Sequence, residues 1–363
     1  MIPISKPAIG KEEIEAVVSV LKSGVLAQGK RVEEFEEAFA RFIGVKYAVA
    51  TSSGTAALYL ALLSHKIGAG DEVITTPFTF VATANSILLA GARPVFADIE
   101  DDYFNVDPSN IERKITKRTK AIIPVHLYGH PADMKAIMEL AHEHGLTVIE
   151  DACQAHGATL NNQKVGSFGT GCFSFYPTKN MTTGEGGMMT ADSEDVAQRA
   201  RMVRNHGSSQ RYSSEILGSN MRMNELSAAL GLVQLHKLPA HNQKRQDNAA
   251  YLSQKLRGIQ GIQLPKVRQG CQHVFHQYTI RVTEGSPISR DELAGILKER
   301  GIGSGIYYPI PIHRQPLYRK LGYDDDLPIS EKMSQQVISL PIHPGVTRQE
   351  LDFISELVKE ALQ

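Results

Sequence analysis

The feature that most constrains the fold is an alternation of short apolar segments with amphipathic segments, which dominates the chain up to residue 151. The apolar segments have the length of strands, and the others carry apolar residues at helical spacing. Such alternation is typical of β-α-β units, which build a mostly parallel sheet covered by helices. The predicted strands are Tyr47–Thr51, Glu72–Thr76, Pro94–Ile99, Ala121–Val125 and Thr147–Asp151, and the predicted helices are Glu12–Lys22, Val32–Phe42, Thr55–Ser64, Phe80–Leu89 and Asp133–His144.

The second half of the chain predicts longer helices and then a second domain. A polar stretch with Gly and Pro at residues 258–270 marks the boundary. We therefore expect a three-layer α/β/α large domain at 1–257, with a mostly parallel mixed sheet, and a smaller α+β domain at 258–363. The remaining predicted elements are strands at Gly187–Ala191, His273–Val282 and near Ile306, and helices at Ser193–Asn205, Met223–Leu238, Asn242–Arg257, Arg290–Arg300 and Arg348–Leu362.

Composition excludes several classes of protein. The 39 Lys and Arg residues balance the 39 Asp and Glu residues, so binding to nucleic acid or to an anionic membrane is not expected. The three cysteines are widely spaced and odd in number, which indicates a reducing compartment and disfavours a structural zinc site. The segment after Met1 has no apolar run typical of a signal peptide, and no stretch is long enough to span a membrane. These features predict a cytoplasmic enzyme.

Three stretches that follow predicted strands carry candidate chemistry, because ligands of open parallel sheets bind at the carboxyl ends of the strands. The first stretch, Ser52–Leu58, is a small-residue loop that leads into a helix. Free backbone N–H groups at a helix N-terminus bind phosphate. Taken alone, the stretch is explained more simply by capping of the helix through Ser53 or Thr55.

The second stretch begins at Asp151, the last residue of a predicted central strand. Desolvation at such a position disfavours an ionised carboxylate unless a cation or a strong donor lies nearby. A structural Asp that caps the following turn explains this residue equally well. The sequence therefore proposes Asp151 as a functional acid without excluding the structural role.

The third stretch, Cys172–Gly187, places Lys179 among aromatic, Thr and Gly residues. Most lysines lie on solvated helix faces, whereas this one follows a strand, on a turn whose glycines permit a ligand to approach closely. A partly desolvated lysine amine is neutral more often and attacks carbonyl groups. A surface lysine remains an alternative for this stretch alone.

Together the three stretches match the needs of pyridoxal 5′-phosphate (PLP). This cofactor has a phosphate, a pyridine nitrogen and an aldehyde, which require a phosphate-binding loop, an acid and an amine. Lys179 would hold the aldehyde as a Schiff base, and Asp151 would keep the ring nitrogen protonated.

The chain resembles the DegT/DnrJ/EryC1/StrS family of PLP-dependent nucleotide-sugar aminotransferases, which have fold type I. The resemblance runs from Ile4 to the last predicted helix and is most specific at Ser174–Asn180 and Thr183–Gly187. It implies that Lys179 is the Schiff-base lysine and that Asp151 is the partner of the pyridine nitrogen. Family members that resemble sugar dehydratases carry His in place of the lysine, so Lys179 argues against that chemistry.

The resemblance also implies cofactor contacts beyond the lysine and the acid. Gln154 matches the residue that contacts the ring hydroxyl, and Phe80 matches an aromatic residue stacked on the ring. The residues that match phosphate ligands are Gly54, Thr55 and Ser174.

A homodimer with two composite active sites is implied by Asn220, which matches an Asn that reaches the phosphate from the neighbouring subunit. Met221 stands where the family usually has Tyr. Contacts with the nucleotide sugar are implied for Arg222, Tyr308 and His313.

The implied reaction is a ping-pong transfer of an amino group from an amino acid, glutamate by resemblance, to a nucleotide-linked keto-sugar. The alternatives are an aminotransferase acting on a cyclitol or carbocyclic ketone, an aminoshikimate-type PLP enzyme, and a non-catalytic regulatory or binding protein. The last alternative predicts damage to Lys179 or Asp151, and both residues are intact.

Two other motifs are given structural interpretations. Gly166–Gly171 is rich in glycine, but a dinucleotide-binding fingerprint opens a helix, and this stretch leads into a predicted strand. His126 and His130 flank a Gly and precede Pro131, so no helix presents them together, and His142-Glu143-His144 lacks ligand spacing. We therefore expect no metal site.

Overall fold

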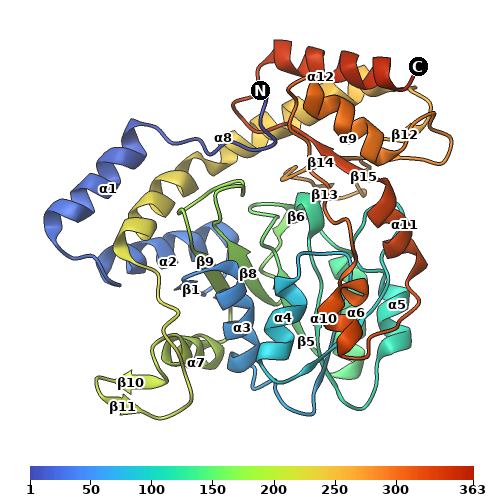
Figure 1. Ribbon diagram of the computed structural model, residues 1–363. Coiled ribbons are helices and arrows are strands. Elements are labelled where there is room, and N and C mark those ends of the chain that lie inside the picture. The colour runs from blue at the N-terminus through green and yellow to red at the C-terminus, as the bar shows by residue number, and fades with distance from the viewer.

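The computed structural model describes residues 1–363 and contains a seven-stranded sheet with helices on both faces (Figure 1). The strand order is β1-β9-β8-β5-β4-β2-β3. Only β9 runs antiparallel to its neighbours, so the sheet is mostly parallel, as predicted. The strands are β1 (Tyr47–Thr51), β2 (Glu72–Thr75), β3 (Arg93–Phe96), β4 (Thr119–Ile123), β5 (Thr147–Asp151), β8 (Thr170–Ser174) and β9 (Gly187–Ala191).

Alternating residues of the strands pack against different helix layers. On β1, Ala48 and Ala50 face one layer and Val49 faces the other. The three-layer α/β/α architecture expected for the large domain is therefore confirmed. One layer contains α2 (Lys30–Ile43), α5 (Pro108–Lys114), α6 (Met134–His144) and the first half of α8 (Glu225–Leu256), and the other contains α3 (Gly54–Ser64), α4 (Ala82–Leu89) and α7 (Glu194–Arg204).

Side-chain caps set the starts of many helices. Ser53 Oγ accepts a hydrogen bond from the backbone N–H of Ala56, which satisfies one of the free amides at the start of α3. Other helices use the same device, with caps at Asp107, Asp133, Ser193, Asn224, Ser289 and Thr347.

A second core lies around a small sheet with the order β12-β14-β15. Its residues come from the end of α8, from α9 and α12, and from Ile2 near the N-terminus. The division at residue 257 stays a prediction, because α8 contributes side chains to both cores. The elements are β12 (Ile262–Gln263), β14 (Tyr278–Val282), β15 (Val337–Leu340), α9 (Arg290–Glu299) and α12 (Arg348–Ala361).

The prediction of two helices at Met223–Leu238 and Asn242–Arg257 is wrong, since α8 is one helix that continues through Pro239. Proline removes one backbone donor and crowds the carbonyl four residues earlier, which usually ends a helix. Here buried residues on both sides of it, Leu238 and Leu252, pack into the two different cores. Tertiary packing therefore outweighs the local penalty, and the long helix joins the two cores (Figure 1).

The two strands predicted after residue 257 are shorter than expected. The segment His273–Gln277 is irregular, and only Tyr278–Val282 forms a strand. The expected strand near Ile306 is a single bridge between Gly305 and Ser339. Cys271–Gln272 (β13) instead pairs with β6 (Thr159–Leu160), which pairs with β7 (Gln163–Lys164).

Some helices were not predicted from the sequence, and some elements lie outside the two cores. Helices α10 (Pro316–Lys320) and α11 (Pro328–Gln336) were not predicted, and they pack against the large domain through Tyr318 and Met333. A hairpin, β10 (Ser208–Gln210) with β11 (Ser213–Ser214), projects from the body, and α1 (Lys11–Ser23) lies along α8 (Figure 1). None of the helices combines the length and the apolar character that crossing a bilayer requires.

Candidate active site

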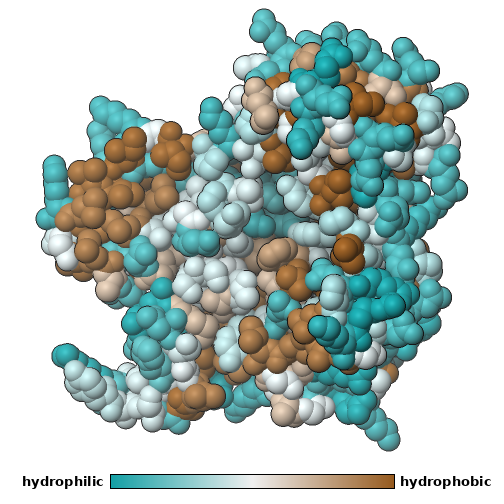
Figure 2. All heavy atoms as spheres, in the orientation of Figure 1, coloured by the Kyte–Doolittle hydropathy of each residue, from teal (hydrophilic) through white to brown (hydrophobic).

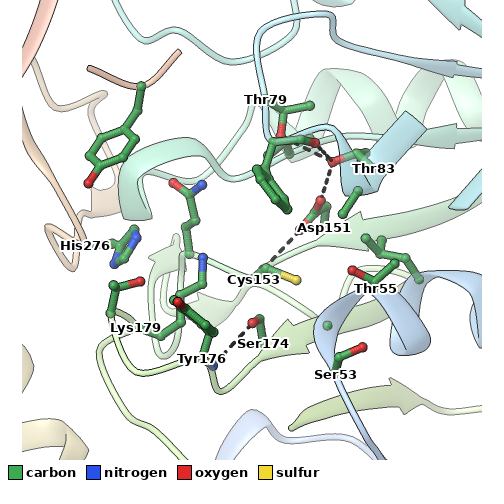
Figure 3. Close-up of a pocket in the computed structure, with 18 of the residues that line it drawn as sticks. Ser53, Thr55, Thr79, Thr83, Asp151, Cys153, Ser174, Tyr176, Lys179 and His276 are labelled. Carbon is green, nitrogen blue, oxygen red and sulfur yellow. Dashed lines mark hydrogen bonds between the residues drawn. The ribbon is translucent and has the colours of Figure 1, made fainter. Parts of the chain in front are cut away.

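A cavity of about 690 Å³ opens at the carboxyl ends of the parallel strands (Figure 3). Its volume lies in the range of small-molecule and cofactor sites. Residues that follow β1, β2, β5 and β8 form one part of its wall, and the segments near residues 276 and 308 form the rest. The lining residues of the first part include Ser53, Gly54, Thr55, Thr79, Phe80, Thr83, Asp151, Cys153, Gln154, Ser174, Tyr176, Lys179 and Glu185.

One end of the cavity is the N-terminus of α3. The first amides of a helix have no partner within the helix, and they carry the positive end of its dipole. A Cβ atom on Gly54 would lie only 2.6 Å from Cβ of Ser174 and 3.0 Å from Sγ of Cys153. Ser53 caps this helix start, and glycine is required at residue 54 for the close packing.

Asp151 is buried at the end of β5, with 5% of its surface exposed. Thr83 Oγ1 donates a hydrogen bond of 2.7 Å to Oδ2, and the backbone N–H of Cys153 donates one of 3.2 Å to Oδ1. The two donors fix the orientation of the carboxylate in the cavity wall, and each oxygen retains a lone pair for another donor.

Lys179 stands on the turn after β8, where its backbone N–H donates to the carbonyl of Tyr176 over 2.9 Å. Burial lowers the pKa of the Lys179 amine, and the Cys153 thiol and the Asp151 carboxylate partly oppose this shift. A lowered pKa raises the fraction of neutral amine, which is the nucleophilic form. The lysine therefore has the environment that attack on an aldehyde requires.

Gln154 and Tyr308 are joined in the cavity wall. Gln154 Nε2 donates to the Tyr308 hydroxyl over 3.1 Å, and Oε1 accepts from the backbone N–H of Tyr128 over 2.8 Å. Phe80 is 57% exposed, and its ring centre lies 6.3 Å from that of Tyr308. An exposed aromatic ring at a cavity wall provides a stacking surface for a flat ligand.

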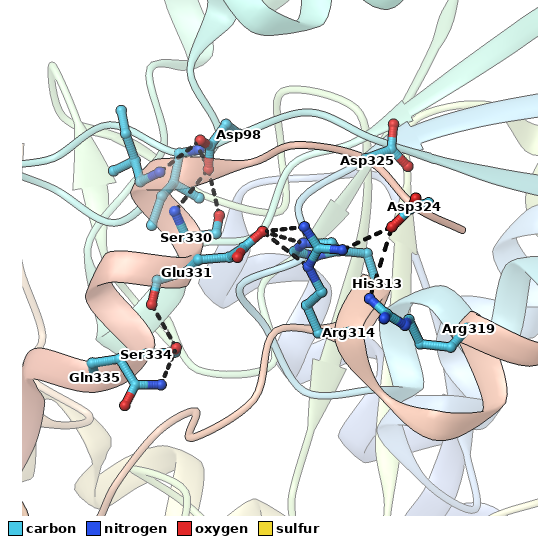
Figure 4. A network of polar contacts seen from close by, with 12 residues as sticks. Asp98, His313, Arg314, Arg319, Asp324, Asp325, Ser330, Glu331, Ser334 and Gln335 are labelled. Atoms are coloured by element: carbon cyan, nitrogen blue, oxygen red, sulfur yellow. Dashed lines mark hydrogen bonds and ion pairs between the residues drawn. The ribbon is translucent and has the colours of Figure 1, made fainter. Parts of the chain in front are cut away.

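Three residues implied by the resemblance lie outside the cavity. Asn220 is exposed and forms an isolated bridge with Asn205, whose side-chain oxygen accepts from Arg222 Nη1 over 2.6 Å. His313 is fully buried, with Nε2 3.1 Å from Oε1 of Glu331 (Figure 4). Within one subunit, the structure thus does not bring these residues to Lys179.

Several lining residues were not predicted from the sequence, among them Thr79, Thr83, Cys153 and His276. A signal existed for the threonines, because they follow β2 as the other candidates follow their strands. Nothing local distinguished His276, which comes from the irregular segment before β14.

The glycine-rich stretch Gly166–Gly171 and His126 have a structural role, because both donate hydrogen bonds to the buried carboxylate of Glu150. Its carboxylate accepts hydrogen bonds of 2.8–2.9 Å from the backbone N–H groups of Gly166, Phe168 and Gly169, and a contact of 3.0 Å from His126 Nε2. Because the Ala132 N–H donates to His126 Nδ1, the proton of the neutral ring lies on Nε2 and is donated to Glu150. The prediction that the stretch leads into a strand is confirmed, since β8 begins at Thr170.

The cavity fits PLP on its own chemistry. The α3 N-terminus with Ser174 would hold the phosphate, Asp151 the ring nitrogen, and Lys179 the aldehyde carbon. When bound, the cofactor supplies an electron sink for breaking bonds at the carbon that bears the amino group.

Comparison with known proteins agrees with this geometry. A UDP-N-acetyl-3-dehydro-alpha-D-glucosamine 3-aminotransferase of Acidithiobacillus ferrooxidans is 41% identical, over 97% of this chain and 94% of that protein. A dTDP-3-amino-3,4,6-trideoxy-alpha-D-glucose transaminase of Streptomyces venezuelae is 40% identical, over 95% of this chain and 90% of that protein. The solved structure of Spr1654 from Streptococcus pneumoniae in its PMP form has a TM-score of 0.95 at 30% identity, covering 99% of this chain and 97% of that one.

The sequence profile of one family matches nearly the whole chain, from residue 7 to residue 359. This match includes every residue that forms the cavity. The protein therefore belongs to the DegT/DnrJ/EryC1/StrS aminotransferase family, whose members use PLP.

Proposed function

We propose that the protein transfers an amino group from glutamate to a keto-sugar carried on a nucleoside diphosphate, by ping-pong turnover. The observation that carries this proposal is the meeting of Lys179, Asp151 and the α3 N-terminus at one cavity. Those groups complement the aldehyde, ring nitrogen and phosphate of the cofactor. The named activities of the relatives, on a UDP-sugar and a dTDP-sugar, support the substrate class.

Lys179 has two tasks in the proposed cycle. Its amine would hold the cofactor in the resting enzyme and would be released when the amino donor takes its place. The free amine would then move a proton, as general base and then as general acid, between the donor carbon and the cofactor carbon that are joined to the same nitrogen. The lowered pKa of this lysine favours both tasks near neutral pH, because the amine gains and loses its proton more readily.

Asp151 and its neighbours have a supporting task. The carboxylate would accept a hydrogen bond from the protonated ring nitrogen, and the hydrogen bond from Thr83 keeps the carboxylate oriented. Gln154 would contact the ring hydroxyl, Phe80 would stack on the ring, and the start of α3 with Ser174 would bind the phosphate.

The remaining wall, which includes Gln277, Tyr307 and Tyr308, offers polar groups for a sugar. No arginine lines the cavity. Basic groups for the substrate's phosphates and for the donor's carboxylates therefore come from another surface. Glutamate as the donor rests on the family resemblance.

We propose that this other surface belongs to a second copy of the chain. Asn220 is exposed beside the projecting β10–β11 hairpin, where Tyr212 and Leu217 are 91% and 89% exposed. A large apolar surface gathers over α1 (Figure 2), where Ile14 and Leu21 are more than half exposed. Exposed apolar surface of this kind is typical of protein interfaces. In such a homodimer Asn220 and Arg222 would complete the partner's cavity.

The proposal is tested by loading the enzyme with pyridoxamine phosphate and incubating it with 3-keto and 4-keto sugars on UDP, dTDP and GDP. Mass spectrometry should show that one nucleotide sugar gains an amino group in place of its ketone. Conversion of only a cyclitol or carbocyclic ketone, or an elimination product, would replace the nucleotide-sugar assignment with that chemistry. No conversion of any ketone by cofactor-loaded enzyme would indicate a binding protein.

A further inference from the structure

Tyr128, on the turn that follows β4, has a strained backbone conformation next to the cavity wall. Its φ angle is +58°, in the left-handed region that a bulky residue rarely adopts. Such a conformation persists where its surroundings over-determine it, and it concentrates at functional sites. The residue is buried and does not itself line the cavity, so any role in the site must act through its contacts.

Neighbouring segments hold the turn in place. The N–H of Leu127 donates to Oδ1 of Asn105 over 2.9 Å. The carbonyl of Tyr128 accepts from the N–H of Gln277 over 3.2 Å. The backbone of Tyr128 is therefore imposed by residues that are distant in the sequence.

This backbone fixes the orientation of the Gln154 amide. The N–H of Tyr128 donates to Oε1 of Gln154 over 2.8 Å. The reverse orientation of the amide would place two donors against each other, so both hydrogens of Nε2 point away from Tyr128. One of these hydrogens is donated to the hydroxyl of Tyr308 over 3.1 Å.

The side chain of Tyr128 holds the segment that carries Tyr308. Its hydroxyl donates to the backbone carbonyl of Tyr307, the residue before Tyr308. Tyr128 thus positions Gln154 through its backbone N–H and Tyr308 through its hydroxyl.

Tyr308 keeps its own hydrogen for a ligand. Burial raises the pKa of the Tyr308 hydroxyl, so the group stays protonated near neutral pH. Its hydrogen-bond partner in the protein is Nε2 of Gln154, and an amide nitrogen donates but does not accept. The other titratable groups near it are Asp151, Tyr307 and Cys153, and none of them accepts its hydrogen. Both members of the pair line the cavity, so a ligand there meets two donors, the Tyr308 hydroxyl and the second hydrogen of Gln154 Nε2.

We propose that Tyr308 donates to the ring oxygen of the cofactor beside Gln154, and that Tyr128 is the positioning residue for both donors. The inference rests on the proposed function, in which Gln154 contacts this oxygen, and Tyr308 is hydrogen-bonded to the same amide nitrogen. Two donors at one oxygen stabilise its ionised form over its protonated form. The Tyr308 hydroxyl is thereby assigned to the cofactor, whereas Gln277 and Tyr307 of the same wall remain for the sugar.

The test compares the affinities of the cofactor-free, full-length chain for pyridoxamine phosphate (PMP) and for its 3-deoxy analogue, which lacks the ring oxygen. Neither compound carries an aldehyde for Lys179, so equilibrium dialysis measures non-covalent contacts alone. We expect Y308F to bind PMP about tenfold more weakly than wild type does, because it loses a hydrogen bond to an ionised oxygen. The analogue should bind to both proteins equally, so the ratio of the two affinities isolates the contact.

Gln154 and Tyr128 are tested by the same ratio. Q154E keeps an acceptor for the N–H of Tyr128 but places an acceptor where the ring oxygen needs a donor, so it should lower the ratio further than Y308F does. Y128F loses only the hydroxyl that holds Tyr307, and it should lower the ratio in the same direction as Y308F.

Y318F is the matched control, because Tyr318 is also a buried tyrosine but its hydroxyl donates to Asn85, outside the cavity. The absorption of bound PMP, which reports ionisation of the ring hydroxyl, provides a second measurement. Y308F should move this transition to higher pH by about one unit, and Y318F should not move it. Thermal unfolding of each variant identifies any loss of fold, and Y308M replaces Y308F if that variant does not fold.

An unchanged ratio of the two affinities in Y308F and Y308M would overturn the proposal. If both affinities were unchanged, the hydroxyl would act elsewhere, and if both fell together, Tyr308 would only shape the cavity. A wild-type ratio in Y128F would overturn the positioning role of Tyr128. If the enzyme aminates no nucleotide keto-sugar, the proposed function fails, whereas the comparison of PMP with its analogue still decides the role of Tyr308.

Discussion

Among single residues, Lys179 makes the most direct chemical prediction. Borohydride reduces the bond between a lysine amine and the cofactor aldehyde, so it should fix the cofactor mass on the peptide that carries Lys179. Lys179→Ala should fold but carry no label, and Lys164→Ala, outside the cavity, should be labelled like wild type. Label on another lysine would refute the assignment.

Asp151 makes a second prediction at this scale. Asp151→Asn keeps the shape of the side chain but removes the charge that keeps the ring nitrogen protonated, so single-turnover proton transfer should slow by ~10²–10³. Thr83→Val removes the 2.7 Å donor to Asp151 and should slow the same step about tenfold. Thr75→Val, which loses a buried hydroxyl bound to Ile123, serves as the control. Wild-type rates in Asp151→Asn would exclude the proposed role.

At the scale of elements, the junction between the start of α3 and the end of β8 controls cofactor binding. Gly54→Ala would place a Cβ atom 2.6 Å from Ser174, which forces the helix start away from the strand. We expect the variant to fold but to retain the cofactor at least tenfold more weakly, as measured by equilibrium dialysis. Gly295→Ala is the control, since a Cβ atom there meets nothing and alanine favours the helix. Equal retention in the two variants would contradict this role of the junction.

The loop between β7 and β8 depends on another buried group. The Glu150 carboxylate accepts hydrogen bonds from four donors, on Gly166, Phe168, Gly169 and His126. In Glu150→Gln, the side-chain amide group would point its own hydrogens at some of these donors and leave them unpaired. Buried donors left unpaired cost about 1–3 kcal/mol each, so the variant should unfold at a clearly lower temperature in calorimetry. Glu299→Gln, at the exposed end of α9, should leave the Tm unchanged. An unchanged Tm in Glu150→Gln would show that this network does not stabilise the fold.

At the scale of the whole molecule, the proposed homodimer is tested by mixing inactive chains. If Asn220 serves the partner's cavity, a dimer of one Lys179→Ala chain and one Asn220→Ala chain has one site with both lesions and one site with neither. Two different affinity tags allow such dimers to be purified and their composition verified. The mixed dimer should recover about half of the wild-type activity. Activity no higher than that of the two parents would place Asn220 in its own subunit's site, or exclude this kind of dimer.

Local patterns predict most of the large domain. The parallel strands follow from short apolar segments between helices, and the positions of Asp151 and Lys179 follow from their place after strands. These features depend on neighbours in the sequence, since a strand or a helix is selected by periodicity and by caps over a few residues. Each stretch of the candidate cofactor site could therefore be located from local sequence, although only the three stretches together indicated the cofactor.

Packing between segments that are distant in the sequence determines the remaining features of the structure, and no local sequence pattern predicts this packing. Pro239 ends a helix by local rules, yet α8 continues because its two halves are buried in different cores. His276 enters the cavity because contacts with Gly129, Asn180 and Arg245 impose a backbone that the residues of its own segment do not favour. The amino-acid order thus specifies elements and reactive residues, whereas the free energy of burying distant segments together decides how the elements join and which side chains share the cavity with Lys179.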